Sequence, residues 1–575
     1  MAANISIGNQ SFDYMRENKS FYVDKSALIR EWWETDDAVT LITRPRRFGK
    51  TLNISMLECF FSTKYAGRSD LFEGLSVWED EKYRGLQGMY PVICVSFAGI
   101  KADNFQGAKN GIIHALANAY DAHRYVKDSD ILGPEEKKMY DALHVYALDP
   151  SPDKKIDDQS VTTALQTLSS YLERYHSKKA IIFLDEYDTP LQEAYAAGYW
   201  RELVRFIREL FNFTFKDNKK LHRALLTGIT RVSKESVFSD LNNLLVVTTT
   251  SKEYSTAFGF TEKEVFAALE EKGLSDQREG VKAWYDGFNF GDAADIYNPW
   301  SITMYLRRKE YRPYWADTSS NILISELVRE GTPEIKMQME KLLAGECLET
   351  ELDEQVIFEQ LKKKKGAIWS LLVACGYLKP VERIFSEKRS KFIYKLMLTN
   401  HEVALMFREM VAAWFPEDEV SYGNFKEALI TGDLDYMNQY MNEISEKMFS
   451  SFDVGRKPSE QAQPERFYHG FVLGLIVDLE GRYRIRSNRE SGLGRYDVML
   501  EPLNSTDDAI VIEFKVFSPQ KDRTMGQAVQ NALKQIEEKR YDTELNSRGI
   551  SGERIRHYGF VFEGKKVLIG QGDGE

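Results

Sequence analysis

A short polar segment between a predicted strand and a predicted helix constrains the fold of this chain more than any other feature. The apolar run 38–42 leads into Thr43-Arg-Pro-Arg-Arg-Phe-Gly-Lys-Thr51, after which apolar residues recur at helical spacing as far as Phe60. A strand, a loop ending in Gly-Lys-Thr and a helix make a phosphate-binding loop, in which backbone N–H groups and the helix N-terminus hold phosphate. The segment predicts an α/β domain that binds a nucleotide.

The residue types of this loop assign roles within the predicted site. Lys50 is expected to reach the β- and γ-phosphates and Thr51 to hold Mg²⁺. Further nucleotide contacts are expected from the remaining loop residues, which are Arg46, Arg47, Phe48, Gly49 and Leu52. Arg44 stands where the general pattern has its first glycine. On this segment alone, an ordinary helix N-terminus with a flexible entry stays open as an alternative.

A second segment supports nucleotide binding. Ala180-Ile-Ile-Phe-Leu-Asp-Glu186 is typical of a buried strand of a parallel sheet, with two carboxylates at its C-terminal end. Open α/β sheets bind their ligands at that end. We expect Asp185 to hold Mg²⁺ through water and Glu186 to polarise the water that attacks the γ-phosphate. A solvated strand end is the alternative, but the two motifs in this order favour a nucleotide site.

A third strand is predicted at 223–226, followed by Thr227-Gly-Ile-Thr-Arg231. Thr227 lies where a polar side chain can sense the γ-phosphate, and Arg231 could stabilise charge in the transition state, within its own chain or in a neighbour. Thr-Gly after a strand is also ordinary turn chemistry, so this assignment keeps an alternative. With a further strand at 91–97 and helices between, the region predicts a mostly parallel sheet with helices on both faces.

The C-terminal part carries a second group of reactive side chains. Asp497 precedes a turn, and the strand 509–516 places Glu513 and Lys515 on one face and apolar residues on the other. Buried charges need partners or a metal, so Asp497 and Glu513 are predicted to hold Mg²⁺, and Lys515 to position or activate water. Glu465, on a helix expected before the hairpin, could add a metal ligand. A strand-edge salt bridge between Glu513 and Lys515 is the alternative.

Length and composition bound the remaining possibilities. At 575 residues the chain is too long for one core. The net charge of −12 excludes a surface that is basic throughout, although not a local basic channel. The four cysteines form no C-x-x-C pair, which excludes a zinc site and a disulfide framework. The chain has no apolar run of about 18 residues and no apolar N-terminus, so we expect a cytoplasmic protein without a membrane partner.

Nearly the whole chain resembles the bacterial and archaeal AAA-ATPase-like proteins that carry a C-terminal PD-(D/E)xK nuclease-superfamily domain. The motifs that carry this resemblance are Tyr22-Val-Asp-Lys-Ser26, Arg44-Pro-Arg-Arg-Phe-Gly-Lys-Thr51, Leu184-Asp-Glu-Tyr-Asp188, Leu226-Thr-Gly-Ile-Thr-Arg231, Trp284-Tyr-Asp-Gly-Phe288, Tyr297-Asn-Pro-Trp-Ser301, Phe467-Tyr-His-Gly470, Gly494-Arg-Tyr-Asp497 and Glu513-Phe-Lys515. Proteins of this kind have arginine in place of the first loop glycine.

The resemblance implies a P-loop ATPase domain at 1–255, a helical or winged-helix lid at 256–400, a helical connector and linker at 401–460, and a restriction-endonuclease-like α/β domain at 461–575. The cofactors implied are ATP and Mg²⁺, and the partner is nucleic acid, with DNA favoured over RNA. The first hypothesis is a nuclease regulated by nucleotide state. The alternative is an ATP-dependent switch or scaffold whose C-terminal domain binds nucleic acid or protein without cleaving. A homo-oligomer and a monomer both stay open.

Overall fold

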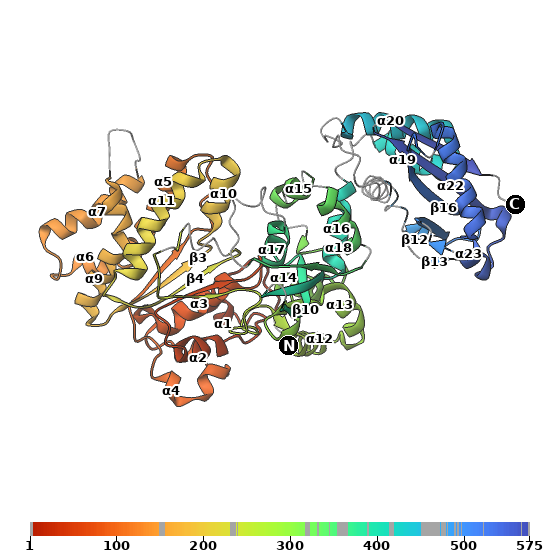
Figure 1. Ribbon diagram of the computed structural model, residues 1–575. Helices are drawn as coiled ribbons and strands as arrows, with labels where there is room; N and C mark the ends of the chain where they lie inside the picture. Colours follow the sequence, from red (N-terminus) through yellow and green to blue (C-terminus); the bar gives the residue numbers. More distant parts are fainter. Residues whose placement is uncertain are drawn as a thin grey trace. The chain divides into compact units, whose positions relative to one another are not determined.

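The structure is a computed structural model of the 575-residue chain (Figure 1). It describes residues 4–148, 156–230, 237–316, 322–329, 333–353, 366–412, 419–449 and 481–572, apart from 239, 344, 388–389, 488–489, 492–493, 496, 521 and 565, together with 472, 476 and 479. The chain divides into two compact units, Met1–Ile324 with Cys347–Ala404, and Ser325–Glu346 with Leu405–Glu575. Within the described residues, no helix combines the length and apolar character needed to cross a membrane.

The first unit is built on a five-stranded parallel sheet of order β2-β3-β4-β1-β5. Its strands are β1 (Val39–Thr43), β2 (Val92–Ser96), β3 (Ala180–Asp185), β4 (Leu221–Gly228) and β5 (Leu244–Val247). β1 and β3 are buried along their whole length, as their continuous apolar runs predict. The expected parallel sheet is confirmed, and the carboxyl ends of β1, β3 and β4 meet at one edge.

Helices cover both faces of this sheet, with α5 and α11 on one side and α3 on the other (Figure 1). The helices of this region are α1 (Phe12–Glu17), α2 (Ala27–Glu34), α3 (Lys50–Phe61), α4 (Glu81–Arg84), α5 (Phe105–Ala122), α6 (Arg124–Asp128), α7 (Pro134–Leu148), α8 (Asp158–Thr162), α9 (Ala164–His176), α10 (Thr189–Ala197) and α11 (Trp200–Phe211). In α11 apolar residues at helical spacing are buried while the intervening arginines and glutamates face outward, which fixes the face that packs on the core.

A middle segment completes the first unit. It contains the small antiparallel sheet β6-β8-β7 and the helices α12 (Glu262–Glu271), α13 (Arg278–Tyr285) and α14 (Pro299–Arg308). The strands of that sheet are β6 (Phe260–Thr261), β7 (Phe288–Phe290) and β8 (Ala293–Tyr297). Then follow β9 (Leu348–Thr350), α17 (Ala367–Ala374) and the hairpin of β10 (Leu378–Ser386) and β11 (Lys391–Leu398), in a sheet of order β10-β11-β9. The middle segment therefore contains two small antiparallel sheets besides its helices.

The second unit is a mixed sheet of order β12-β15-β16-β17-β18 in which only β16 and β17 run parallel. Its main strands are β12 (Tyr483–Ser487), β15 (Val498–Pro502), β16 (Ala509–Val516), β17 (Ile555–Glu563) and β18 (Lys566–Gly572), with a two-residue pair, β13 (Glu490–Ser491) and β14 (Gly494–Arg495), alongside. The helices described in the remaining chain are α15 (Ile322–Arg329), α16 (Pro333–Leu343), α18 (His401–Ala412), α19 (Glu419–Thr431), α20 (Leu434–Phe449), α22 (Met525–Lys539) and α23 (Thr543–Ser547).

Helices cover both faces of this sheet as well. The parallel crossover between β16 and β17 runs through α22, whose Val529 and Leu533 pack on Val511. On the opposite face, Leu429 of α19 and Met441 of α20 share a core with alternate residues of β16. Strand β16 is therefore covered on both sides, and its alternation decides which side chains point towards α22.

Candidate functional site

The loop between β1 and α3 contains two residues with left-handed backbone. Gly49 caps α3 with φ +82° and Arg47 has φ +63°, so both lie in the left-handed region. Lys50 is buried, and its Nζ donates to the carbonyls of Arg44 at 3.2 Å and Pro45 at 3.0 Å. The same Nζ lies 3.2 Å from Glu186 Oε1. The ammonium group of Lys50 therefore lies at the carboxyl edge of the sheet, between the loop carbonyls and Glu186 at the end of β3.

Three predicted site residues meet at the Asp185 carboxylate. Thr51 Oγ1 donates to Asp185 Oδ2 at 2.6 Å, and Thr227 Oγ1 at the end of β4 donates to Asp185 Oδ1 at 2.5 Å. Burial raises the pKa of Asp185, as does the charge of Glu186, while the two hydroxyls and Lys50 oppose that rise. A hydroxyl beside a carboxylate at the end of a phosphate loop is the hard oxygen donor set that suits Mg²⁺, so these residues fit the implied metal.

The side chain of Arg44 is buried against the segment that follows β5. Its guanidinium is fully buried and donates to the carbonyls of Thr43 at 2.9 Å, Thr248 at 2.8 Å and Tyr254 at 3.2 Å. It also stacks 4.7 Å from the Phe290 ring centroid. Burial lowers the pKa of Arg44 to about 9, and only the charge of Glu31 opposes this shift. Arg44 therefore ties the start of the loop to the segment after β5.

The rest of the loop contacts the middle segment. Phe48 is buried between Phe288 and Phe290, with ring centroids 4.7 and 5.3 Å away. The guanidinium of Arg47 lies 3.9 Å from the centroid of the Trp300 ring. The side chain of Arg46 is exposed. Neither Phe48 nor Arg47 thus extends freely into the predicted nucleotide site, because both are held by aromatic side chains of the middle segment.

Two hydrogen bonds connect this loop to a buried carboxylate. The carbonyl of Arg46 accepts from Asn298 Nδ2 at 3.4 Å and from Trp315 Nε1 at 3.1 Å. Glu402, at the start of α18, is fully buried and accepts from the backbone N–H of Trp315 and from Ser301 Oγ at 2.9 Å. Asn298 also caps α14, which carries Ser301. Both residues that donate to the Arg46 carbonyl are therefore connected to Glu402. Trp315 donates to Glu402 through its backbone N–H, and Asn298 accepts from the N–H of Ser301, whose hydroxyl donates to Glu402.

Sequence reasoning gave Asp188 no role, although it belongs to the motif quoted at 184–188. The structure places it beneath the end of β4, fully buried. It accepts from the backbone N–H groups of Ile229 at 3.1 Å and Thr230 at 2.8 Å, and from Thr230 Oγ1 at 2.8 Å. Burial raises the pKa of Asp188, and the charge of Glu186 adds to the rise. Asp188 fixes the backbone that precedes Arg231, which itself lies outside the described residues.

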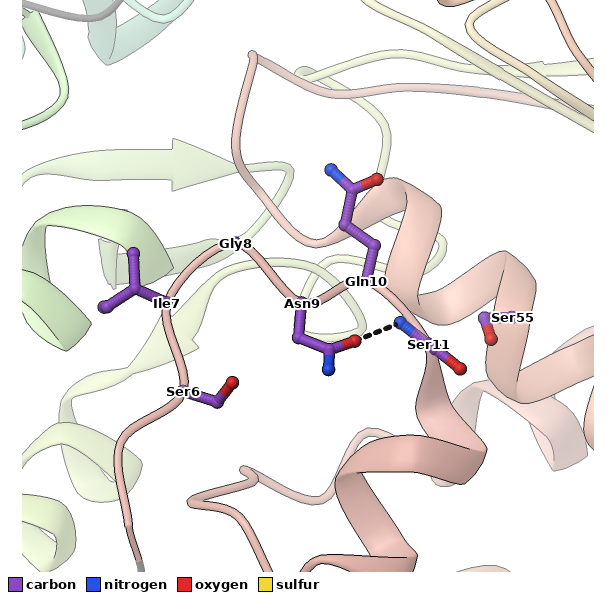
Figure 2. Close-up of a pocket in the computed structure, with 7 residues that line it drawn as sticks. All are labelled: Ser6, Ile7, Gly8, Asn9, Gln10, Ser11 and Ser55. Atoms are coloured by element: carbon purple, nitrogen blue, oxygen red, sulfur yellow. Dashed lines mark hydrogen bonds between the residues drawn. The ribbon is translucent and has the colours of Figure 1, made fainter.

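A hollow of about 650 Å³ opens beside α3 (Figure 2). The N-terminal segment 6–11 lines it together with Ser55, which lies one helical turn after Thr51. The backbone N–H of Phe12 donates to Ser55 Oγ at 3.0 Å and fixes the segment to the helix. Gly8 has φ +81°, and Asn9 Oδ1 accepts from the N–H of Ser11 at 3.0 Å, so the segment turns tightly.

The C-terminal constellation also comes together. Asp497 Oδ2 accepts from the backbone N–H of Phe514 at 2.8 Å, which sets its carboxylate beside the neighbouring strand. Glu513 is buried with 3% of its surface exposed, and Gln535 of α22 donates to its Oε1. The carbonyl of the same Gln535 accepts from Lys515 Nζ at 2.7 Å. One amide of α22 therefore orients both the carboxylate and the ammonium group of β16.

Tyr541, which lies between α22 and α23, is buried with 1% of its surface exposed, and its hydroxyl accepts from Gln535 at 3.3 Å. Glu465 lies outside the described residues. Among the residues that are described, no group of three or more histidine, cysteine, aspartate or glutamate side chains is placed to hold a metal ion.

Two known families match separate parts of this chain. Residues 6–238 match the family described as predicted AAA-ATPase, and residues 463–572 match the PD-(D/E)XK nuclease superfamily. An uncharacterised protein from the 5′ region of vnfD in Azotobacter chroococcum is 26% identical over 573 residues, which cover 95% of this chain and 94% of that protein. This chain therefore combines a predicted AAA-ATPase-like domain with a C-terminal domain of the PD-(D/E)XK nuclease superfamily.

Proposed function

We propose that the first unit binds and hydrolyses ATP at the edge formed by β1, β3 and β4. Lys50 would contact the β- and γ-phosphates, and Thr51 and Asp185 would hold the Mg²⁺ that neutralises phosphate charge. Glu186 would orient the attacking water, and Thr227 would keep the Asp185 carboxylate in place. The observation that supports this proposal is the cluster in which Thr51 and Thr227 both donate to Asp185.

The nucleoside is proposed to lie in the hollow along residues 6–11. Ser55 borders that hollow one turn of α3 beyond Thr51, so a ligand whose phosphates occupy the loop reaches it with its sugar and base. Among the residues that line the hollow are the polar Ser6, Asn9 and Gln10.

The second unit is proposed to cleave nucleic acid phosphodiesters, and DNA is the substrate that we favour. The Gln535 bridge carries this proposal, because it orients Glu513 and Lys515 together beside Asp497. Bound Mg²⁺ would supply Lewis-acid stabilisation of phosphate charge. Asp497 and Glu513 would hold the metal, with Glu465 as a further ligand, and Lys515 would orient the attacking water.

Nucleotide state is proposed to regulate the second unit through α18. This helix begins in the first unit at the buried Glu402 and continues into the part of the chain assigned to the second unit. Because the loop carbonyl of Arg46 is linked to Glu402 through Trp315 and Asn298, a shift of the loop on ATP binding would change the support at the start of α18.

The test is a cleavage assay with the purified full-length chain. Linear, circular and single-stranded DNA, and RNA, are incubated with Mg²⁺ or Mn²⁺, with and without ATP. Glu513→Gln and Lys515→Ala should abolish cleavage, whereas Lys534→Ala, an exposed lysine on the same α22, should retain it. Persistent cleavage in both active-site variants would refute the assignment. Lack of cleavage under every condition, with ATP turnover intact, would favour a nucleotide switch that binds without cutting.

The ATP site is tested in parallel by nucleotide binding and phosphate release. Lys50→Ala should abolish ATP binding with the fold intact, and Glu186→Gln should bind ATP but hydrolyse it slowly. Normal ATP affinity in Lys50→Ala would contradict the phosphate-loop assignment. Unchanged turnover in Glu186→Gln would remove Glu186 from its proposed role.

A further inference from the structure

The segment 227–230, which ends β4 and continues beyond it, is held at both ends by Tyr187 and Asp188. The N–H of Tyr187 donates to the Thr227 carbonyl at 3.0 Å, and the Tyr187 hydroxyl donates to the Thr230 carbonyl at 2.7 Å. Asp188 accepts from the N–H of Thr230 at 2.8 Å. Because all of this segment is buried, water does not compete for these bonds. The course of the chain after β4 is therefore set by the chain after β3.

Most of this support comes through one oxygen atom of Asp188. The fully buried carboxylate accepts at Oδ2 from the N–H groups of Ile229 at 3.1 Å and Thr230 at 2.8 Å. The Thr230 hydroxyl and the Gln192 amide of α10 donate to the same oxygen, each at 2.8 Å. Oδ1 accepts a longer bond of 3.3 Å from Ile229. A side chain that keeps an oxygen at the Oδ2 position can therefore retain these bonds, whereas alanine removes all of them.

Gly228 shows how closely Asp188 and Tyr187 pack on this segment. A Cβ atom at position 228 would lie 2.6 Å from Asp188 Oδ1 and 2.6 Å from Cε1 of the Tyr187 ring. Contacts this short do not occur between real atoms, so a methyl group there would displace Asp188 or the ring of Tyr187. Glycine is therefore required for space at this position, and Gly228→Ala disturbs the contact without removing any of its hydrogen-bonding groups.

Glu186 lies between two residues that are both bonded to the end of β4. On one side Thr227 Oγ1 donates to Asp185, and on the other side the N–H of Tyr187 donates to the Thr227 carbonyl. Glu186 itself has φ +53°, in the left-handed region that is unfavourable for a residue with a side chain. Such a conformation persists only where the surrounding structure holds it. The bonds to β4 therefore hold the carboxylate that lies 3.2 Å from Lys50 Nζ.

We propose that Asp188 is a positioning residue for ATP hydrolysis, which holds Glu186 in its left-handed conformation by fixing the segment 227–230, with Gly228 providing the space for this contact. The proposal rests on the function proposed for the first unit and deepens it. The groups proposed to bind the phosphates lie on the loop and on α3, whereas Asp188 acts on the residue proposed to orient water. Changes at Asp188 or Gly228 should therefore slow hydrolysis and leave ATP binding intact.

The experiment is steady-state ATP hydrolysis by the full-length protein, with ATP affinity measured separately by equilibrium binding. Asp188→Ala and Gly228→Ala should each lower kcat by about 10–100-fold, as expected when a catalytic group is misplaced by about an ångström, with the Kd for ATP unchanged. Asp188→Asn should recover most of the turnover, because its amide oxygen can replace Oδ2. Gly99→Ala is the matched control and should keep its kcat, because Gly99 is exposed and no described atom lies within 4 Å of a Cβ there.

A double variant separates positioning from a general loss of structure. If Asp188 acts through Glu186, adding Asp188→Ala to Glu186→Gln should slow hydrolysis no further, whereas independent effects would multiply. Should Asp188→Ala fail to fold, Thr230→Val gives the same comparison with a smaller decrease in kcat, because it removes one donor to Asp188 and keeps the shape of the side chain.

The contrary results are distinct. Unchanged kcat in Gly228→Ala, or multiplying effects in the double variant, with Glu186→Gln still slow, would overturn the positioning role and leave the ATPase assignment standing. A loss of ATP affinity in parallel with kcat would show that Asp188 supports the fold alone, and would also overturn the proposal. Failure of the unmodified protein to hydrolyse ATP would overturn both the proposal and the ATPase assignment.

Discussion

Replacing Arg44 with glycine restores the general phosphate-loop pattern, yet the structure predicts that Arg44→Gly damages the protein. Glycine is not required at this position, because the left-handed residues of the loop are Arg47 and Gly49. The substitution removes a fully buried guanidinium that satisfies carbonyl groups on two segments of chain. We therefore expect a less stable first unit and weaker ATP binding.

The magnitude follows from the hydrogen bonds that are lost. Two carbonyls, of Thr43 and Thr248, accept from Arg44 at 2.9 and 2.8 Å, and that of Tyr254 accepts at 3.2 Å. Leaving a buried acceptor unsatisfied costs about 1–3 kcal/mol, although water entering the vacated space offsets part of this. Glycine at an ordered position adds about 0.5–1 kcal/mol of backbone entropy. The expected loss in free energy of unfolding is about 3–5 kcal/mol.

The assay is urea unfolding of the full-length chain, followed by far-UV circular dichroism and by tryptophan fluorescence, with ATP affinity measured on the folded protein. Arg46→Ala is the control, because it truncates the neighbouring, exposed side chain and leaves its carbonyl in place; it should change stability by about 0.5 kcal/mol or less. An Arg44→Gly variant as stable as the unmodified chain, with equal or tighter ATP binding, would refute the reasoning.

Three further changes test the two sites and the path between them. Asp185→Asn should raise the melting temperature of the nucleotide-free protein by a few degrees at pH 7–8. Burial raises the pKa of Asp185 in the folded state. The stabilisation from Asp185 is therefore fully present below the unfolded-state pKa of about 3.9 and is lost as the pH rises through the folded-state pKa. A gain in melting temperature that does not shrink as the pH approaches 4 would contradict this cause. Gln535→Met keeps the size of the side chain but removes the amide. This variant should slow phosphodiester cleavage by about 10–100-fold with little change in nucleic-acid affinity. Equal cleavage rates would show that the amide does not orient Glu513 and Lys515. Glu402→Gln should reduce the ratio of cleavage rates with and without ATP by about fivefold or more, because an amide has only one of the two oxygens that accept from Trp315 and Ser301. An unaltered ratio, with Glu382→Gln as the exposed control, would exclude Glu402 from the coupling.

The sequence alone predicts those features that depend on local residue patterns or on the positions of neighbouring strand ends. Continuous apolar runs predicted β1 and β3, and the rule that parallel strands carry ligands at their carboxyl ends led to the expectation that Thr51, Asp185 and Thr227 lie together. Glu513 and Lys515 were placed on one strand face because side chains alternate in a strand. In each case the relevant residues are close in sequence or lie at equivalent strand ends.

The features that were not predicted depend on distant contacts. Arg44 binds carbonyls about two hundred positions away, so nothing beside it in the sequence shows what it does. Glu402 is one acidic residue at a helix start, an ordinary exposed position until Trp315 and Ser301 fold over it. The hairpin of β10 and β11 was missed for the opposite reason, since its outer half is exposed on both faces and lacks the apolar alternation that marks a strand.

In the proposed ATP site, the position of Lys50 makes binding an exchange of hydrogen-bond and ion-pair partners. An ammonium group has three hydrogens to donate, and here it faces two carbonyl oxygens and the Glu186 carboxylate. Phosphate that reaches Lys50 must compete with that carboxylate, so the measured affinity is the difference between two ion pairs. Displacement would also release Glu186 when a substrate is present, so the group proposed to orient water would become available only in the occupied site.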